Sequence, residues 1–522
     1  MIVSRRTTPP QTRASGRSRR APDPGIARHA TGTTMIDLQP HLGTPIEGRN
    51  GQFYYRGDES RVGPYDHYLA GIRRGALASW TATLARRARE LGRRGIRYHV
   101  VVVPGAHVAC PEDLPDDLRG RIRAPFPRLQ AALAGTDGLR LHYALADLVS
   151  RDPSPPGPGR DGAPHRTYRR NDTHWTEYGA YRNYLTVCRA IARELDVRVV
   201  EPADVTFATK QAFGDLSILR LPEGRPETIP LAVIRGGHRA HTVSKNTTVV
   251  RNRVIRMRSD TAPATAALIF HDSYATAQAK FWARSFGRTT FAGVTHRVYL
   301  DAVARERPDV VISIMAEHRL FEWPNDHDPW TFADDFESDC RSPAGRRTAD
   351  VMVLYRQQKI AAAADAAAGI GAEPGFGAYH ARVAAQALIG AHRVDDALAM
   401  AMTALSLDRE SPSNLWMAAY ASLYAGKPED ALTLATWAAG SDPHHGAWTE
   451  LLASILIGLG RREEAALVLE RAVAAVDDSP GLWRLLAETR EAGGRPGPAR
   501  QARAMVDALT GEETGPGRAL DA

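Results

Sequence analysis

The chain has 522 residues, which is too long for one hydrophobic core, so two to four domains are expected. Its 43% hydrophobic and 24% charged residues are typical of a globular protein. The formal net charge is +8, but residues 1–34 hold seven arginines against one acid and supply most of this excess. The remainder is near neutral and has no basic stripe, which argues against a nucleic-acid-binding protein.

The first 39 residues are predicted to form a disordered basic tail, with Met35 as an alternative start. The tail lacks the apolar core of a secretory signal, and Arg5-Arg6 is followed by threonines and prolines instead of the apolar stretch of a twin-arginine signal. No run of about 18 apolar residues predicts a membrane span. Three widely separated cysteines cannot all pair and lack the spacing of a metal site. We therefore expect a cytoplasmic protein.

Residues 40–345 show predicted strands that alternate with predicted helices. Apolar residues at helical spacing predict one long helix over 66–95. The continuous β-branched run "IRYHVVVVP" (96–104) is typical of a strand that is covered on both faces of a parallel sheet. "ATAALIF" (264–270), "RTTFAGV" and "PDVVISIM" predict further buried strands, and the proline- and glycine-rich residues 151–166 predict a surface loop. This order predicts an α/β domain with a doubly wound parallel sheet.

The C-terminal part repeats every 34 residues. The interval is kept by four alanines and three glycines, namely Ala397, Ala431, Ala465, Ala499, Gly426, Gly460 and Gly494. A helix–turn–helix period of this length is typical of tetratricopeptide repeats, in which small residues let paired helices pack closely. We assign residues 377–511 to these repeats, 346–376 to a preceding linker or helix, and 512–522 to a disordered tail. Such an array predicts a platform for a protein partner or a structural cap.

The motif "NDTHWTEYGA" places Asp172 two positions before His174. In an extended or turn conformation these side chains share a side, so the Asp172 carboxylate can reach Nδ1 of His174 and leave Nε2 free. A serine nucleophile needs this combination of an orienting acid and a base. Trp175 is expected to pack beside the imidazole, and Thr176 to cap the helix that follows.

The motif "LIFHDSYA" supplies the candidate nucleophile, Ser273. A buried strand that ends in a serine before a helix puts Oγ at the carboxyl edge of the sheet, where open α/β folds bind ligands. Backbone N–H groups at the start of that helix can then face a developing oxyanion. Simple capping by Asp172, and by Asp272 or Ser273, explains both motifs without catalysis, so spacing alone leaves the two interpretations open.

Further motifs are spread over about residues 45–325. In chain order they are "GRNGQFYYRGD", "VVVPGAHVACPEDLP", "YRRNDTHWTEYGA", "FGDLSILRL" and "LIFHDSYA". Together they resemble the alginate O-acetyltransferase family of the AlgX/AlgJ type. The resemblance implies an SGNH-hydrolase-like fold in which the acid and the base precede the serine. It implies Asp172 as orienter, His174 as base and Ser273 as the nucleophile that passes an acyl group to a polysaccharide hydroxyl.

The chain departs from this family at several points. His271 stands where the family usually has glycine, and Ala106 stands where a lysine is common. The family works on the export side of the membrane, whereas this sequence shows no export signal. The C-terminal repeats stand where some members carry a carbohydrate-binding module.

Other residues are candidates for supporting roles. Trp175, Tyr274 and Arg319 are expected to bind substrate, although a surface ion pair between Arg319 and Glu317 is an equally good interpretation. Asp215 in "GDLS" is a candidate to support the site. "NDHDPW" (325–330) offers two aspartates and a histidine, but without a second ligand set it predicts a solvated turn and no metal site. No metal or other cofactor is expected.

The leading hypothesis is a serine-dependent O-acyltransferase that uses an acyl donor and a carbohydrate or glycoconjugate acceptor. An esterase with the same triad is an alternative, because water and a sugar hydroxyl can resolve the same acyl-enzyme. A third hypothesis is a non-catalytic repeat scaffold with a decayed SGNH-like domain. A protein partner is expected at the repeats, and no nucleic acid.

Overall fold

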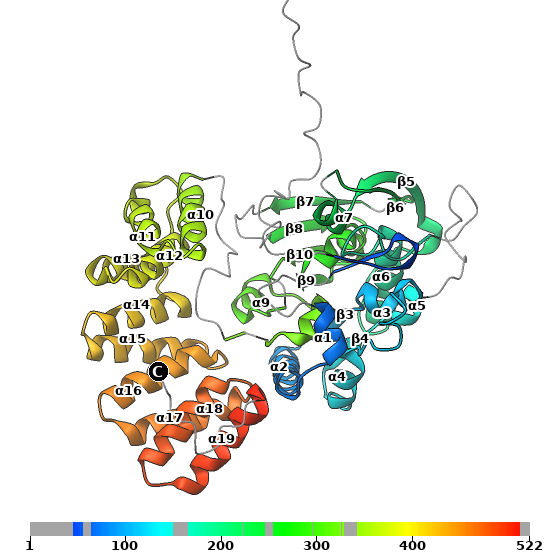
Figure 1. Ribbon diagram of the computed structural model, residues 1–522. Coiled ribbons are helices and arrows are strands. Elements are labelled where there is room, and N and C mark those ends of the chain that lie inside the picture. The colour runs from blue at the N-terminus through cyan, green and yellow to red at the C-terminus, as the bar shows by residue number, and fades with distance from the viewer. Residues whose placement is uncertain are drawn as a thin grey trace, which may run out of the picture. The chain divides into compact units, whose positions relative to one another are not determined.

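The computed structural model describes residues 45–55, 64–149, 165–245, 254–327 and 342–511, except residues 222, 238, 295 and 325. The tails expected at 1–39 and 512–522 and most of the loop expected at 151–166 lie outside these residues. Within them an α/β region is followed by an all-helical region (Figure 1). Among the described helices, none combines the length and apolar character that crossing a bilayer requires.

The α/β region is built on a seven-stranded sheet. Its strands in chain order are β3 (Arg97–Val103), β4 (Leu139–His142), β7 (Ala240–Lys245), β8 (Val254–Ser259), β9 (Ala266–His271), β10 (Arg288–Ala292) and β11 (Val310–Ala316). They lie in the order β4-β3-β11-β9-β10-β8-β7. The neighbours from β4 to β10 are parallel, whereas β8 runs antiparallel to both β10 and β7. The predicted doubly wound α/β fold is confirmed, and the antiparallel strands at one edge, which the sequence did not predict, make the sheet mixed.

Alternate residues of the central strands enter two separate hydrophobic cores. Val101 and Ile269 belong to one core, and their neighbours Val100 and Leu268 belong to the other. The first core includes residues of α6 (Glu177–Ile191) and α8 (Ala279–Ser285), and the second includes residues of α2 (Arg74–Arg93), α4 (Phe126–Ala132) and α9 (Leu300–Glu306). Because successive side chains point to opposite faces, a strand covered on both faces must be apolar throughout. This explains the unbroken valine run of β3.

The single helix predicted over residues 66–95 is two helices, α1 (Pro64–Ala70) and α2. Gly71 follows α1 with φ +81°, a backbone conformation that favours glycine, and its N–H donates to the His67 carbonyl at 2.7 Å. The apolar spacing continues across this break, so periodicity alone did not reveal it.

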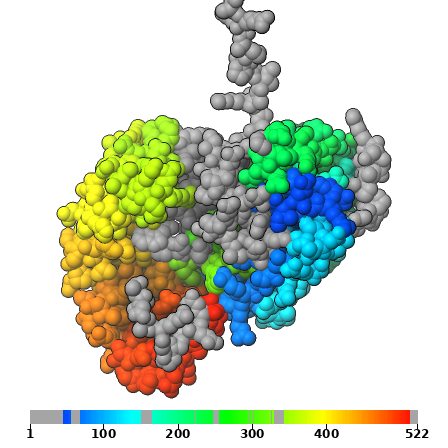
Figure 2. Space-filling model, in the orientation of Figure 1, coloured from blue at the N-terminus to red at the C-terminus, as the bar shows by residue number. Residues whose placement is uncertain are grey.

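Smaller elements lie outside the main sheet. The antiparallel pairs are β1 (Ile46–Glu47) with β2 (Phe53–Tyr54) and β5 (Val205–Phe213) with β6 (Pro226–Ile234), and the short helices are α3 (Ala106–Ala109), α5 (Leu145–Val149) and α7 (Asp215–Arg220). Arg225 Nη1 lies 3.0 Å from Glu47 Oε1, 178 positions away in the sequence. Figure 2 shows the corresponding blue and green segments side by side on one face of this region.

The all-helical region consists of consecutive helix pairs. Its helices are α10 (Pro343–Arg356), α11 (Ile360–Ala368), α12 (Ala378–Gly390), α13 (Val394–Leu407), α14 (Pro412–Tyr424), α15 (Pro428–Ser441), α16 (Gly446–Gly458), α17 (Arg462–Ala475), α18 (Pro480–Ala492) and α19 (Pro496–Thr510). The four periodic alanines of the sequence are at most 1% exposed. The periodic glycines Gly426, Gly460 and Gly494 follow α14, α16 and α18 with φ of +69°, +77° and +70°. The 34-residue sequence period therefore reflects close contacts between helices at the alanines and left-handed turns at the glycines.

Candidate active site

Asp172 and His174 lie in the turn that leads into α6. Asp172 Oδ1 is 2.8 Å from His174 Nδ1 and also accepts a hydrogen bond from the His174 backbone N–H at 3.0 Å. The Thr176 hydroxyl caps α6 by accepting from the Gly179 N–H at 3.2 Å, as predicted from the sequence. Capping therefore does not use Asp172, whose carboxylate orients the imidazole instead.

Ser273 begins a 3-10 turn (Ser273–Ala277), which is separated from the end of β9 only by Asp272. Its Oγ lies 2.8 Å from His174 Nε2, although the two residues are 99 positions apart in the sequence. Ser273 is exposed, whereas Asp172 is only 6% exposed. The fold thus brings Asp172, His174 and Ser273 into one continuous row of hydrogen-bonded side chains.

Asp272 fixes the turn that carries Ser273. Its Oδ1 accepts from the Tyr274 backbone N–H at 3.0 Å, and its Oδ2 accepts from the Ala316 N–H at the end of β11 at 2.7 Å. The Tyr274 N–H was among the donors expected to face an oxyanion. It donates to Asp272 Oδ1 instead. This corrects that part of the sequence interpretation.

Arg169 and the backbone of Asp215 stabilise the ionised Asp172 carboxylate. Arg169 pairs with Asp172 Oδ2, and the Asp215 N–H donates to the same oxygen at 3.3 Å. Burial raises the pKa of Asp172, but the hydrogen bond from His174 and the Arg169 charge outweigh it and lower that pKa to about 2. Burial lowers the pKa of His174, but the hydrogen bond and charge of Asp172 outweigh it and raise that pKa to about 9. The Asp172–His174 pairing therefore favours the ionised carboxylate and the protonated imidazole.

The structure also gives Asp215 a position, which the sequence alone could not. The Thr173 backbone N–H donates to Asp215 Oδ1 at 2.8 Å, and the Thr173 hydroxyl donates to Oδ2 at 2.9 Å. Burial and the Asp172 charge raise the pKa of Asp215 to about 6. Donor atoms of Asp172, His174 and Asp215 lie within 4.8 Å of one another, close enough for a cation. Both carboxylates nevertheless accept protein hydrogen bonds, so a network that orients His174 accounts for the cluster.

Gly214 lets the Asp215 segment approach the Asp172 turn. A Cβ at this position would come within 1.8 Å of the Asn171 carbonyl oxygen. Gly214→Ala is therefore expected to displace the turn and slow any reaction at Ser273 by about a hundredfold, the scale of a misplacement near 1 Å. Stopped-flow measurement of p-nitrophenyl acetate turnover tests this. Gly92→Ala on α2, where an added Cβ meets no atom within 4 Å, is the matched control, and an unchanged rate in Gly214→Ala would contradict the packing argument.

Two residues that were expected to bind substrate, Trp175 and Tyr274, are buried at the turn that carries Ser273. Trp175 is 2% exposed and its indole N–H donates to the Tyr274 carbonyl at 3.0 Å, so it supports the turn from inside and does not face a ligand. Tyr274 is 3% exposed, and its hydroxyl donates to the Thr173 carbonyl at 2.6 Å. Its ring centroid is 4.9 Å from that of His174, so Tyr274 forms the wall beside the imidazole that was predicted for Trp175.

Arg319 has a different partner from the one considered in the sequence. Its Nη1 lies 2.7 Å from Glu322 Oε1, and the expected alternative partner Glu317 is fully buried. Glu317 accepts hydrogen bonds from the hydroxyls of Tyr68 at 3.1 Å and Tyr143 at 2.8 Å. Burial outweighs these hydrogen bonds and raises the pKa of Glu317 to about 7. An acid directly after the apolar run "VVISIMA" was the sequence signal for this buried group.

Asp326, in the segment predicted to be a solvated turn, is buried. The carboxylate accepts from Arg87 Nε at 2.7 Å and from Arg87 Nη2 at 2.6 Å, and it also pairs with Arg86 at 2.8 Å. Its side chain is 4% exposed, and that of Arg87 is 1% exposed. The segment thus contributes a buried ion pair; apart from Asp326 and His327, residues 325–330 lie outside the described part of the chain.

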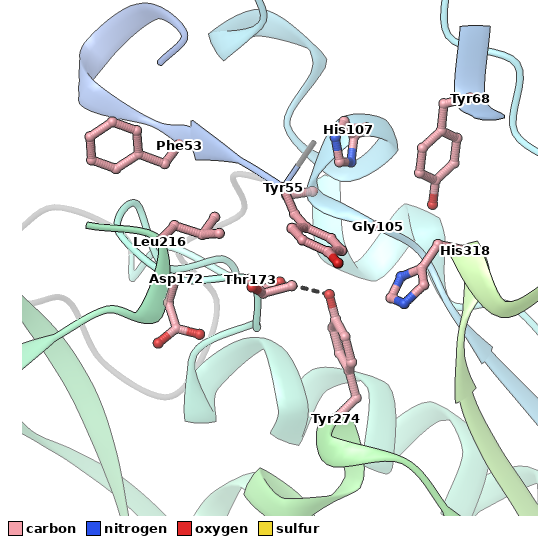
Figure 3. Close-up of a pocket in the computed structure, with 11 residues that line it drawn as sticks. Phe53, Tyr55, Tyr68, Gly105, His107, Asp172, Thr173, Leu216, Tyr274 and His318 are labelled. Carbon is pink, nitrogen blue, oxygen red and sulfur yellow. Dashed lines mark hydrogen bonds between the residues drawn. The ribbon is translucent and has the colours of Figure 1, made fainter. Parts of the chain in front are cut away.

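A pocket adjoins the Asp172 turn (Figure 3). Its lining comes from segments far apart in the sequence and is mainly aromatic or small, with one acid and one leucine: Phe53, Tyr55, Tyr68, Gly105, Ala106, His107, Asp172, Thr173, Leu216, Tyr274 and His318. The sequence did not predict Tyr55, His107 or His318 as site residues. In Figure 3 the rings of Tyr55, Tyr274 and His318 converge on one side of the pocket.

A Ser–His–Asp row at the carboxyl edge of a doubly wound sheet is the arrangement used by serine acyl-transfer enzymes. Residues 66–230 match the SGNH hydrolase-like domain of the acetyltransferase AlgX, and residues 422–489 match the tetratricopeptide repeat. One part of the chain is therefore similar to the SGNH hydrolase-like acetyltransferase domain, and another part is similar to tetratricopeptide repeats. The matched span includes Asp172 and His174 and ends before Ser273.

Several solved structures are similar to parts of the chain. A DHHW family protein from Eubacterium siraeum is 16% identical, with 53% of this chain and 95% of that chain covered and a TM-score of 0.38. PatB1 of Bacillus cereus is 13% identical, with 48% and 94% covered and a TM-score of 0.38. The O-acetyltransferase domain of Pseudomonas putida AlgJ is 15% identical, with 53% and 92% covered and a TM-score of 0.35. No curated protein matches the chain.

Proposed function

We propose that Asp172, His174 and Ser273 are the catalytic triad of an O-acetyltransferase that acts on hydroxyls of a carbohydrate or glycoconjugate. The observation that carries this proposal is the pair of 2.8 Å contacts, one from Asp172 Oδ1 to His174 Nδ1 and one from His174 Nε2 to Ser273 Oγ. Both distances lie within the reach needed for proton transfer. They favour a working site over a decayed one.

The reaction proceeds in two balanced halves. His174 Nε2 takes the Ser273 proton as Oγ attacks the carbonyl carbon of an acetyl donor, and the imidazolium then protonates the departing donor oxygen. The acetyl group is now an ester on Ser273. An acceptor hydroxyl gives its proton to His174 and attacks this ester, and Ser273 Oγ leaves and recovers the proton. Asp172 holds the imidazole and stabilises its charged form in both halves.

Incubation with p-nitrophenyl acetate, with and without oligosaccharide acceptors, tests the proposal. Mass spectrometry of the intact protein and of its peptides should find an acetyl group on Ser273 before an acceptor is added. The acetyl group should then move to the sugar. Absence of any acyl group on Ser273 under all conditions would refute the triad.

An esterase is the second candidate, and the exposure of Ser273 favours it. Water reaches an exposed acyl-serine freely, and the same triad activates water as readily as a sugar hydroxyl. Release of p-nitrophenol at equal rates with and without acceptor, with no acetylated sugar, would identify hydrolysis as the activity.

The repeats give the chain a capacity for protein interaction. A partner that docks on them and a cytoplasmic location stay predictions from the sequence. Fractionation of cells and sequencing of the native N-terminus test the location, and cross-linking in those cells tests for the partner.

The activity should rise with pH toward about 9. The base must be neutral to accept the serine proton, and Asp172 raises the pKa of His174 to about 9, so each pH unit below this value removes most of the neutral form. Single-turnover acylation between pH 6 and pH 10 measures the profile. In Asp172→Asn the acylation rate should be much lower and its midpoint should move toward the ordinary histidine value of about 6.5. An unshifted midpoint in that variant would contradict the proposed pairing.

A further inference from the structure

Glu227 of β6 lies against the stretch of chain that leads directly to Asp172. Its Oε2 accepts a hydrogen bond from the Arg170 backbone N–H at 2.8 Å, and its Oε1 accepts one from the Asn171 N–H at 3.3 Å. Oε1 also accepts from Arg169 Nε at 3.1 Å. One carboxylate therefore binds three consecutive residues, and Asp172 is the next residue of the chain.

The Arg169 guanidinium connects Glu227 to Asp172. Its Nη1 pairs with Asp172 Oδ2, while its Nε donates to Glu227. Its Nη2 donates to the Phe213 carbonyl of β5 at 2.9 Å. The planar fork of an arginine fixes the directions of all these bonds at once. The side chains of Arg169 and Glu227 are 14% and 12% exposed, so water screens their attraction only weakly.

The segment from β5 to β6 makes further contacts with the residue before Asp172. Asn171 Nδ2 donates to the Arg225 carbonyl at 2.8 Å, and the Ser217 N–H donates to the Asn171 carbonyl at 3.1 Å. β5 and β6 pair over all nine residues of each strand, which holds Glu227 in register with the Phe213 carbonyl. The position of Asp172 therefore depends on this segment, to which Glu227 contributes a charged contact.

Glu227 also balances the charge of Arg169. Arg169 lowers the pKa of Asp172, and Asp172 in turn raises the pKa of His174 to about 9. Without Glu227, the guanidinium would direct its full charge at Asp172 and draw the carboxylate away from His174. The stabilisation of the protonated imidazole by Asp172 would then weaken.

We propose that Glu227 is a positioning residue for the reaction at Ser273: acting through Arg169 and the backbone of residues 170 and 171, it places Asp172 for its contact with His174 Nδ1. This inference rests on the proposed function of the triad. It adds a residue that acts on the reaction only through other residues.

NMR titration of the His174 imidazole tests the placement of Asp172 in the full-length protein without any substrate. Histidine labelled at Cε1 gives the signals, and the signal that is lost in His174→Gln identifies His174. In Glu227→Gln the pKa of His174 should fall from about 9 toward about 8. The reason is that the amide carries no charge and presents an N–H where the Arg170 N–H needs an acceptor. An unchanged His174 pKa in the folded variant would overturn the inference.

The pH profile of p-nitrophenyl acetate turnover, corrected for the uncatalysed rate, gives a second readout of Glu227→Gln. Its midpoint should fall together with the pKa of the imidazole, and the rate on the high-pH plateau should fall by about tenfold because the base is less well oriented. A lower plateau with an unmoved midpoint would mean that Glu227 supports only the fold, which contradicts the proposed role.

Glu306→Gln is the matched control. Glu306 of α9 accepts from Arg256 Nε at 2.9 Å, from Arg256 Nη2 at 2.6 Å and from the Thr290 hydroxyl at 2.7 Å. Its side chain is 14% exposed, close to the 12% of Glu227, but its partners lie on β8 and β10. Glu306→Gln should therefore keep the wild-type His174 pKa and pH profile. Equal pKa changes in the two variants would overturn the inference.

Glu227→Asp keeps the test decisive if Glu227→Gln does not fold, which circular dichroism checks. The aspartate retains the charge but is one methylene shorter, so it cannot reach all three donors. It should lower the pKa of His174 by less than the glutamine does, and an unmoved pKa would again contradict the proposal. Failure of the proposed function would show separately, as absence of an acyl group on Ser273 in the wild-type protein while the His174 pKa still responds to Glu227.

Discussion

Replacement of Ser273 by alanine is expected to abolish acyl-enzyme formation, and His174→Ala is expected to slow it by about three to six orders of magnitude. The reason is that Ser273 Oγ and His174 Nε2, 2.8 Å apart, act as one unit in proton transfer. The double variant should therefore lose hardly more activity than either single variant. Release of p-nitrophenol from p-nitrophenyl acetate, corrected for the uncatalysed rate, gives the three activities, and peptide mass spectrometry reports the acyl group on Ser273.

The matched control for this series is Thr276→Ala. Thr276 is an exposed hydroxyl on the same 3-10 turn and is not part of the row of hydrogen bonds. It should keep the wild-type rate. If the fold-loss of activity in the Ser273→Ala/His174→Ala protein equals the product of the two single losses, the two residues act independently. That result would contradict a shared triad.

Asp326→Ala is expected to lower the free energy of unfolding by about 3–5 kcal/mol. The substitution leaves the Arg87 guanidinium, only 1% exposed, without the carboxylate that accepts from its Nε and Nη2. The loss of a buried charge partner lowers the free energy of unfolding much more than the loss of an exposed one. Chemical denaturation followed by tryptophan fluorescence should show unfolding at a lower denaturant concentration.

Glu464→Ala serves as the stability control. Glu464 pairs with Arg461 at 2.6 Å, but these side chains are 54% and 44% exposed, so the change should stay within about 1 kcal/mol. Treatment of the wild-type protein with a chelator should leave the transition unchanged, since Asp326 holds arginine. Equal effects of Asp326→Ala and Glu464→Ala would contradict the buried ion pair.

Much of the architecture could be predicted because local sequence patterns indicate it. The apolar runs of β3, β9, β10 and β11 and the 34-residue period report burial and helix contact within short stretches of chain. The antiparallel strands β7 and β8 escaped prediction. β7 is mostly exposed and offers no clear apolar pattern, so its pairing depends on the neighbouring strand.

The candidate site was predicted only in part. Each of Asp172, His174 and Ser273 stands in a recognisable local motif, and the resemblance to one family joined those motifs. Charge partners were not predictable in this way. Arg319 was considered with Glu317 and lies against Glu322, and Asp326 was expected in solvent and is buried against Arg87.

The sequence by itself thus determined the fold class and the repeat period, and it proposed Asp172, His174 and Ser273 as one set. Only the tertiary structure decided that Ser273 Oγ reaches His174 Nε2, that Trp175 supports the site from inside, and that aromatic side chains line a pocket beside it. The physical reason is that periodicity depends on neighbours within a turn of helix or strand. Hydrogen-bond partners and burial depend instead on which distant segments the sheet brings together, here residues 99 positions apart.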